Sequence, residues 1–310
     1  MPPQFQTGPA APGAGRASGA RAAASSAFGG VPRRRLLPIR VVGAQQCAGS
    51  CLPARAGSQL RFSFCSYLQK ELVPVRKSGA WEADVTNALV KALSAAPEAQ
   101  FIDVGARTGW FTTVAAVAGH HVIALEPNPR SNCFIERNAA INNVSDRVVV
   151  LDHGADEQNR VLTLEGMRLT GRAEDGTNTL TNNTSGPTKH EAQRAFTPSI
   201  FTPTPEKVST VRIDSLLPLL RSDTLVMQMD VEGFECEALR GASHVLRTRR
   251  VALLMHEWDG GSDAAERGCD WVRAWQPLRD QGLRSFNERG AMLEIAPGTK
   301  NKAAITVMWR

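Results

Sequence analysis

The feature that most constrains the fold is an alternation of short apolar runs and helical segments between residues 101 and 151. Apolar runs at 101–104, 121–125 and 147–151 predict buried strands, and the segments 110–118 and 130–141 between them predict helices. Strand–helix–strand units with short connections form a parallel sheet whose two faces are covered by helices. We therefore expect an α/β fold with a doubly wound, mostly parallel sheet.

The same alternation extends in both directions from this segment. Apolar residues that recur every four positions predict an amphipathic helix over 80–95. Further on, the sequence predicts helices at 214–220 (with Asp214 as its N-cap), 234–246 and 271–278, strands at 224–229 and 251–255, and an antiparallel edge from 292–295 and 304–309. The polar segment 156–207, rich in Thr, Asn and Pro, interrupts the pattern and is expected to be a variable insertion, either functional or disordered.

The first 70 residues differ in composition from the rest of the chain. They contain nine Lys or Arg residues and no acid, since the first acidic residue is Glu71, and they are rich in Gly, Pro, Ala and Ser. Such a segment buries too little apolar surface to offset its ordering entropy, so we expect 1–70 to be a disordered basic leader and 71–310 to be the folded domain.

An acid-free, Arg-rich leader is typical of an organelle transit peptide, which predicts a chloroplast or mitochondrial location after its removal. A secretory signal is disfavoured because Pro38 and Arg40 interrupt the apolar run at 36–42. The alternative is a basic tail, or mispredicted coding sequence, on a cytoplasmic protein.

The net charge of +6 belongs to this leader rather than to the expected domain. Residues 71–310 contain 27 cations against 30 anions, so the domain is expected to be mildly acidic and to have no general affinity for nucleic acid. No run approaches the roughly 18 consecutive apolar residues of a membrane-spanning helix, so no membrane span is expected.

The six cysteines are dispersed: Cys47, Cys51, Cys65, Cys133, Cys236 and Cys269. None forms a C-x2-C pair, so no zinc site is predicted, and six in 310 residues are too sparse for a disulfide scaffold. We expect reduced thiols with structural roles. Three N-x-S/T sequons, at Asn143, Asn182 and Asn183, are interpreted as chance matches because the secretory signal is lacking.

Acidic residues stand at three of the predicted strand ends. Asp103 lies within the first strand, Glu126 directly follows the second, and Asp230 follows the strand at 224–229. In an open α/β sheet, ligands bind beyond the carboxyl ends of the strands, near the point where the strand order reverses. The three carboxylates therefore indicate where the chemistry is expected.

The loop after the first strand favours a nucleoside ligand without a pyrophosphate. Its glycines follow the spacing Gly105-x-x-x-Gly109, and Arg107 stands where a dinucleotide fingerprint has its middle glycine. Asp103 would repel a phosphate and attract an ammonium group, and S-adenosylmethionine carries a nucleoside and an amine but no phosphate. Glu126 is placed to accept hydrogen bonds from ribose hydroxyls, as in NAD sites, so a nicotinamide-dependent oxidoreductase remains the alternative.

Several segments together resemble the FkbM-type methyltransferases. Asp103–Thr112 is similar to the family's first motif, Ala124–Pro129 to its second, and Met229–Glu235 to its most distinctive stretch. Shorter matches are Trp81-Glu82, Asn138, Asn142, Val211–Leu216 and Glu237–Ala242, so that the resemblance spans 79–258.

The resemblance implies a class I S-adenosylmethionine-dependent fold and O-methyl transfer to a small-molecule acceptor, with sugars and natural products among the acceptors associated with the family. The residues that it implies for cofactor binding are Asp103, Gly105, Ala106, Gly109, Glu126, Pro127 and Asn128. The sequence selects no particular acceptor and indicates no oligomeric state.

Two positions depart from the family's pattern. Arg107 stands where the family usually has Asn, and Gln228 stands where Lys is frequent. Arg107 places a cation in the cofactor loop, where it either weakens cofactor binding or points outward. This departure raises a further alternative, a degenerate methyltransferase fold that acts only as a binding module.

Asp230 is the first candidate for a catalytic residue. The cofactor is an activated methyl donor, so the protein has mainly to align the reactants and to take a proton from the acceptor hydroxyl. Asp230 follows a strand end that is expected to face the methyl group, and Glu232, His256 and Glu257 are further candidates. A divalent cation held by Asp230, Glu232 and Glu257 is chemically conceivable, but the spacing does not require it and no metal is predicted.

Overall fold

The computed structural model describes residues 47–165, 168–170, 206–256, 268–287 and 306–309 of the 310-residue chain. Its helices are α1 (Gln69–Ser78), α2 (Ala83–Ala95), α3 (Trp110–Val117), α4 (Pro129–Ile141), α6 (Glu235–Gly241), α7 (Val245–Thr248) and α9 (Trp271–Asp280), with the 3₁₀ helices η1 (Ser145–Arg147) and η2 (Ile213–Leu219). Its strands are β1 (Ser50–Ala56), β2 (Leu60–Ser66), β3 (Gln100–Val104), β4 (Val122–Leu125), β5 (Val148–Leu151), β6 (Gly154–Ala155), β7 (Val161–Glu165), β8 (Arg168–Thr170), β9 (Glu206–Val211), β10 (Thr224–Met229), β11 (Arg250–His256), β12 (Arg284–Asn287) and β13 (Thr306–Trp309). Among the helices in these ranges, none combines the length and the apolarity needed to cross a membrane.

The central sheet confirms the expected doubly wound architecture. Within the described residues its strand order is β12-β13-β11-β10-β3-β4-β5, and neighbouring strands from β11 to β5 run parallel. The chain adds β4 and β5 on one side of β3 and later places β10 and β11 on the other side, so the strand order reverses between β3 and β10.

The edge of this sheet is antiparallel, as the sequence predicts for 304–309. β13 runs antiparallel to both β11 and β12. The other expected edge strand, 292–295, lies outside the described residues. β12, which the sequence analysis does not predict, pairs with β13.

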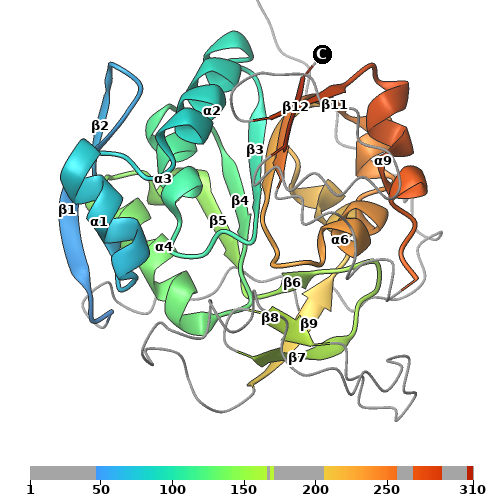
Figure 1. The fold of residues 1–310 in the computed structure, drawn as a ribbon, viewed down its shortest axis with the longest axis horizontal. Helices are drawn as coiled ribbons and strands as arrows, with labels where there is room; N and C mark the ends of the chain where they lie inside the picture. Colours follow the sequence, from blue (N-terminus) through green and yellow to red (C-terminus); the bar gives the residue numbers. More distant parts are fainter. Residues whose placement is uncertain (1–46, 166–167, 171–205, 257–267, 288–305, 310) are drawn as a thin grey trace, which may run out of the picture. The chain divides into compact units, whose positions relative to one another are not determined.

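Helices cover both faces of the sheet, as Figure 1 shows. Phe101 of β3 lies in a hydrophobic cluster with Leu89 of α2 and Val114 of α3. The next residue, Ile102, lies in a cluster with Leu239 of α6. Successive side chains of a strand point to opposite faces, so a strand that is covered on both sides is apolar at almost every position. This is why the central strands are recognisable as continuous apolar runs.

The folded domain begins before residue 71, because residues 50–66 form a β-hairpin. β1 and β2 pair antiparallel over their whole length, and the hairpin, blue in Figure 1, contacts α1. The rings of Phe62 and Phe64 lie 5.3 and 4.9 Å from the ring of Trp110 in the core. The predicted disorder up to residue 70 is therefore wrong for this part, since the average composition conceals alternating apolar residues. From residue 47 onward the chain contains 30 cations and 30 anions, so the expected slight acidity also disappears.

All six cysteines are paired, which corrects the expectation of reduced thiols. Cys51–Cys65 joins the strands of the hairpin, Cys47–Cys133 joins the start of the described chain to α4, and Cys236–Cys269 joins α6 to the residues before α9. The partners are 14, 86 and 33 residues apart, so they become neighbours only when the fold is formed. Disulfides persist in oxidising environments, which is where this pairing is stable.

A smaller sheet forms from the two ends of the expected insertion at 156–207. Within the described residues its order is β6-β9-β7-β8, with β6 parallel to β9 and β7 antiparallel to β8 and β9. Figure 1 shows this sheet below the central one. Residues 171–205 lie outside the described residues. The ends of the insertion are therefore ordered strands.

The helices after β9 differ from the prediction because Asp214 caps a different helix. Residues 213–219 form the 3₁₀ helix η2, and Asp214 lies inside it. Its Oδ1 atom accepts hydrogen bonds from the N–H groups of His244 and Val245, both at 2.9 Å. This cap starts a new helix at residue 245, so the single helix expected over 234–246 is divided into α6 and α7.

Candidate active site

A cavity lies at the carboxyl ends of the central strands, where the strand order reverses. Its wall comes mainly from the loops that follow β3, β4, β5 and β10. The lining residues are Gly105, Arg107, Leu125, Glu126, Pro127, Asn128, Ser131, His153, Gly154, Ala155, Leu164, Asp230, Val231 and Glu232. The structure thus brings together six of the predicted site residues: Gly105, Glu126, Pro127, Asn128, Asp230 and Glu232.

Gly105 lets the loop after β3 touch the loop after β10. Its φ is +80°, a left-handed conformation that favours glycine, and a Cβ atom there would lie 1.9 Å from the carbonyl oxygen of Asp230. The N–H of Asp230 donates to the carbonyl of Val104 at 3.0 Å. No larger residue fits at position 105 unless the two loops separate.

Glu126 is a buried carboxylate that both neighbouring loops hold in place. It is 8% exposed, and its two oxygens accept hydrogen bonds from the N–H groups of Arg107 and Asn128, each at 2.8 Å. Burial raises the pKa of Glu126 to about 7, although these two N–H donors act in the opposite direction. The side chain of Asn128 in turn caps α4 by accepting from the N–H of Arg130 at 2.9 Å.

Arg107 lies within the site, and acidic side chains surround its guanidinium group. Its Nε is 3.8 Å from Oε1 of Glu71 and its Nη2 is 3.6 Å from Oε1 of Glu232. Glu71 is buried and also accepts hydrogen bonds from the hydroxyls of Ser66, at 2.6 Å, and Thr108. The sequence alone does not decide whether Arg107 points outward. Its side chain is only 15% exposed, so its charge is balanced inside the protein.

Asp230 supplies a carboxylate oxygen that is available to a ligand. Its Oδ1 atom is buried and has no hydrogen-bond partner in the part of the chain that the structure describes. Oε1 of Glu235 holds the following turn by accepting from the N–H groups of Val231 and Gly233, at 3.0 and 3.2 Å. Burial, reinforced by the charge of Asp230, raises the pKa of Glu235 to about 8.

Three predicted cofactor residues support the wall of the cavity from behind. Asp103 is fully buried and accepts a hydrogen bond from Thr112 Oγ1 at 2.5 Å, and burial raises its pKa to about 7. Ala106 donates its N–H to the carbonyl of Leu125 at 3.1 Å. Gly109 has a φ of +85° and packs against Ile135. None of the three lines the cavity, and their contact with the cofactor stays a prediction.

Two predicted catalytic residues are not brought to this wall. His256 is buried at the end of β11, where its ring lies 6.5 Å from Trp271 and 5.6 Å from Trp275. Glu257 lies outside the described residues. Of the four catalytic candidates, Asp230 and Glu232 therefore line the cavity.

Several parts of the site are not predicted from the sequence. His153, Gly154 and Ala155 line the cavity directly after β5, and a search of the third strand end as well as the others would have found them. Glu82 has a left-handed φ of 41°, and burial followed by the charge of Asp230 raises its pKa to about 7. Glu71, which pairs with Arg107, follows a segment that composition marks as disordered, so no local signal identified it.

The polar groups of the cavity fit the S-adenosylmethionine that the sequence resemblance implies. Each oxygen of Glu126 accepts one N–H and keeps a further lone pair, which suits the two hydroxyls of a ribose. The buried Oδ1 of Asp230 is an acceptor without a donor among the described residues, which suits a hydrogen-bond donor of a bound ligand.

No cluster of three or more His, Cys, Asp or Glu side chains suited to a metal ion occurs among the described residues. Glu257, one of the three residues considered for a divalent cation, lies outside them. Oxygen ligands for such an ion would have to converge on one point, which Asp230 and Glu232 alone do not provide.

The four carboxyl groups with raised pKa values predict that the protein loses stability as the pH rises. Glu82, Asp103 and Glu126 have pKa values of about 7 and Glu235 of about 8, whereas such groups titrate near 4 in an unfolded chain. Between these limits the folded protein binds protons that the unfolded chain has released, so raising the pH favours unfolding. We expect the thermal unfolding temperature, measured by circular dichroism, to fall between pH 5 and pH 8.

Asp103→Asn provides the control for this pH dependence. The amide oxygen still accepts the hydrogen bond from Thr112, but the side chain no longer titrates, so the fall in unfolding temperature becomes shallower. An unfolding temperature that rises from pH 5 to pH 8 contradicts the prediction.

Known structures resemble the chain only distantly. The precorrin-6y C5,15-methyltransferase from Geobacter metallireducens is 13% identical, with a TM-score of 0.37, over 74% of this chain and 88% of its own. The O-methyltransferase from Bacillus cereus in complex with SAH is 11% identical, with a TM-score of 0.34, over 72% and 79%. The TehB-like SAM-dependent methyltransferase from Corynebacterium glutamicum is 10% identical, with a TM-score of 0.36, over 77% and 94%. Likeness at this level carries no functional assignment. No curated protein matches the chain significantly in sequence.

The family is shown by a match in sequence. Residues 103–282 match the methyltransferase FkbM domain, which is more than half of the 310 residues. The match includes all four loops that build most of the cavity wall. Together with the strand order, it confirms the class I methyltransferase fold and S-adenosylmethionine as the cofactor. The chain belongs to the FkbM methyltransferase family.

Proposed function

We propose that the protein transfers the methyl group of S-adenosylmethionine to a hydroxyl group of a small molecule or sugar. Methyl transfer follows from the family. The observation that carries the choice of a hydroxyl is the buried Oδ1 of Asp230, which lacks a partner among the described residues and lines the same cavity as Glu126. A hydroxyl loses a proton when it is methylated, and a carboxylate within hydrogen-bond reach is suited to take it.

Cofactor binding is assigned to the loops after β3, β4 and β5. The remaining lone pairs of Glu126 accept the ribose hydroxyls, and Gly105 lines the same cavity. Leu125, Ala155 and Leu164 provide apolar wall for the base. When bound, the cofactor supplies an electrophilic methyl group on a sulfonium, so the remaining task of the protein is alignment and proton removal.

Asp230 is better suited than Glu232 to take the proton. The carboxylate of Glu232 lies 3.6 Å from the guanidinium of Arg107, so it is already engaged in an ion pair. Oδ1 of Asp230 has neither an ion pair nor a hydrogen bond within the described residues. His256 faces two tryptophan rings and is not on the cavity wall.

The geometry also bears on the two alternatives. A nicotinamide dinucleotide would bring two phosphate charges to a loop whose surroundings include Glu71, Asp230 and Glu232, and the loop lacks the middle glycine of a dinucleotide fingerprint.

The second alternative, a pure binding module, was suggested by the cation at Arg107. Since two acids balance that cation, it presents no net repulsion to a sulfonium, and the reason to doubt catalysis is removed.

The test of the cofactor site is calorimetric titration with S-adenosylmethionine and S-adenosylhomocysteine at pH 8. We expect both to bind, and we expect Glu126→Gln to weaken binding by about tenfold or more, because hydrogen bonds to a charged group contribute about 1.5–3 kcal/mol. The amide also turns an N–H₂ group toward a backbone N–H donor. Glu98→Gln, at an exposed carboxylate, is the matched control and should bind like the natural protein.

Absence of binding for both ligands would contradict the proposed function. Binding of NADH with enhanced fluorescence would favour the oxidoreductase instead. The acceptor is then sought by incubating the protein with cell extracts and labelled cofactor and identifying the labelled product by mass spectrometry.

A further inference from the structure

A second cavity, of about 250 Å³, lies between α6, α7, α9 and the loop after β6. Its lining residues are Glu157, Arg212, Leu239, Arg240, Ser243, Arg247, Arg273 and Ala274. It shares no lining residue with the methyl-transfer site. Four of its eight lining side chains are arginines, which is the feature that calls for an explanation.

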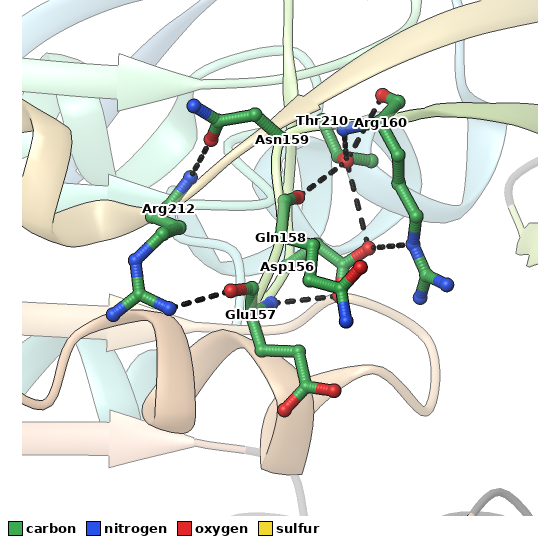
Figure 2. Close-up of polar contacts among 7 residues, drawn as sticks. All are labelled: Asp156, Glu157, Gln158, Asn159, Arg160, Thr210 and Arg212. Atoms are coloured by element: carbon green, nitrogen blue, oxygen red, sulfur yellow. Dashed lines mark hydrogen bonds and ion pairs between the residues drawn. The ribbon is translucent and has the colours of Figure 1, made fainter. Parts of the chain in front are cut away.

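Two of the arginines are fixed by Glu157. Arg212 donates from Nη1 to the carbonyl oxygen of Glu157 at 2.5 Å and forms an ion pair with Asp214 at 2.7 Å. Nε of Arg240 lies 3.0 Å from the carboxylate of Glu157. Figure 2 shows Arg212 reaching the main chain of Glu157, while the carboxylate of Glu157 points away from that contact. A single residue thus positions two guanidinium groups.

The buried side chain of Asp156 holds the backbone of Glu157 in place. Its N–H donates to Oδ1 of Asp156 at 2.7 Å, and Oδ2 of Asp156 accepts from Arg160 at 2.6 Å (Figure 2). Asp156 is fully buried. The end of α6 packs directly against the backbone of Asp156, because a Cβ atom at Gly241 would lie 2.1 Å from the carbonyl oxygen of Asp156. The arginines fixed by Glu157 are therefore held in place before any ligand arrives.

The other two arginines leave the cavity with an excess of positive charge. The side chains of Arg247, on α7, and Arg273, in the first turn of α9, are exposed and have no ion pair or hydrogen bond among the described residues. Asp214 and Glu157 balance Arg212 and Arg240, so the two charges of Arg247 and Arg273 are uncompensated. The hydroxyl of Ser243 adds a neutral donor to the same wall.

We propose that this cavity binds the phosphate or sulfate group of a small anionic ligand, at a site separate from methyl transfer. Guanidinium groups offer planar pairs of N–H donors that match the oxygens of a tetrahedral oxyanion. A dianion would neutralise the two uncompensated arginines. One water molecule needs about 10–15 Å³ on the same measure, so the 250 Å³ of this cavity leaves room for part of the molecule that carries the anion.

The experiment titrates the full, disulfide-bonded chain by calorimetry at physiological salt with glucose 6-phosphate, glucose 6-sulfate and glucose. We expect at least one of the two esters to bind and glucose not to bind. The double variant Arg247→Gln/Arg273→Gln should bind that ester at least about tenfold more weakly, since both charge-assisted contacts are lost. Arg76→Gln, at an exposed arginine of α1, is the matched control and should bind unchanged.

The preferred ester identifies whether a phosphate or a sulfate is the better ligand. Ester binding that is undiminished in the double variant, or no binding of either ester, overturns the proposal. If the double variant does not fold, the two single variants carry the same test, with a smaller expected loss in each. Neither variant touches the first cavity, so this result is independent of whether S-adenosylmethionine binds there.

Discussion

Asp230→Asn is expected to lower the kcat of methyl transfer by about 100-fold or more while leaving the fold intact. General-base catalysis by a positioned side chain contributes roughly 10²–10⁴-fold, and an amide of the same shape does not accept the proton. Oδ1 of Asp230 is the buried, unpartnered carboxylate oxygen among the described residues of the cavity wall. The measurement is the initial rate of label transfer from the cofactor to the acceptor, together with the dissociation constant of S-adenosylhomocysteine.

Two comparisons separate a catalytic role of Asp230 from a binding role. Asp223→Asn, at a side chain that is 94% exposed, should leave the rate unchanged. If Asp230→Asn weakens S-adenosylhomocysteine binding 100-fold but leaves kcat intact, the carboxylate is a cofactor ligand and not the base. A rate within a few-fold of that of the natural protein removes Asp230 from the mechanism altogether.

The part of the site that is predictable from the sequence is the part built by strand ends. Glu126 and Asp230 each follow a continuous apolar run, and parallel strands end at one edge of the sheet, so their convergence follows from topology alone. The same reasoning fails for side-chain direction. Asp103 and His256 stand at the same edge, yet one is hydrogen-bonded behind the wall and the other lies against two tryptophans.

The contribution of the N-terminal hairpin was not predictable from composition. Glu71 reaches Arg107 only because α1 follows β2 and the hairpin packs on Trp110 through Phe62 and Phe64. Both relations are long-range, and the surrounding Gly, Pro and Arg residues dominate any average over the first 70 positions. A residue-by-residue search for alternation would have found the strands, but not their place in the site.

Asp214 illustrates the same limit for helix boundaries. An acidic residue before a helical pattern predicts a cap, and Asp214 is indeed a cap, but for α7, 30 residues further on in the sequence. The local sequence thus predicts the capping role of Asp214 correctly, but it does not predict which helix Asp214 caps. The disulfides follow the same rule, since pairing depends on contacts that only the complete sheet provides.

The double variant Cys236→Ala/Cys269→Ala is expected to lower the free energy of unfolding by about 4 kcal/mol, one of the largest effects of any exchange outside the cavity. In the chain-entropy description, a closed loop of 33 residues restricts the unfolded chain by about this amount. Both cysteines are buried, and the bridge fixes α6, whose first turn carries Glu235, to the start of α9. The measurement is unfolding in guanidinium chloride under non-reducing conditions.

The other disulfides supply the scale against which this loss is judged. Cys51→Ala/Cys65→Ala opens a loop of only 14 residues and should cost about 3 kcal/mol, less than the first variant. Reduction of the natural protein with dithiothreitol should lower its stability below that of either variant, because it opens all three bridges. Two results together would mean that the bridges do not form. The untreated natural protein would be as stable as Cys236→Ala/Cys269→Ala, and it would contain six titratable thiols both before and after reduction. In that case the apolar contacts between α6 and α9, to which Trp275 and Leu278 contribute, hold the two helices together without a covalent link.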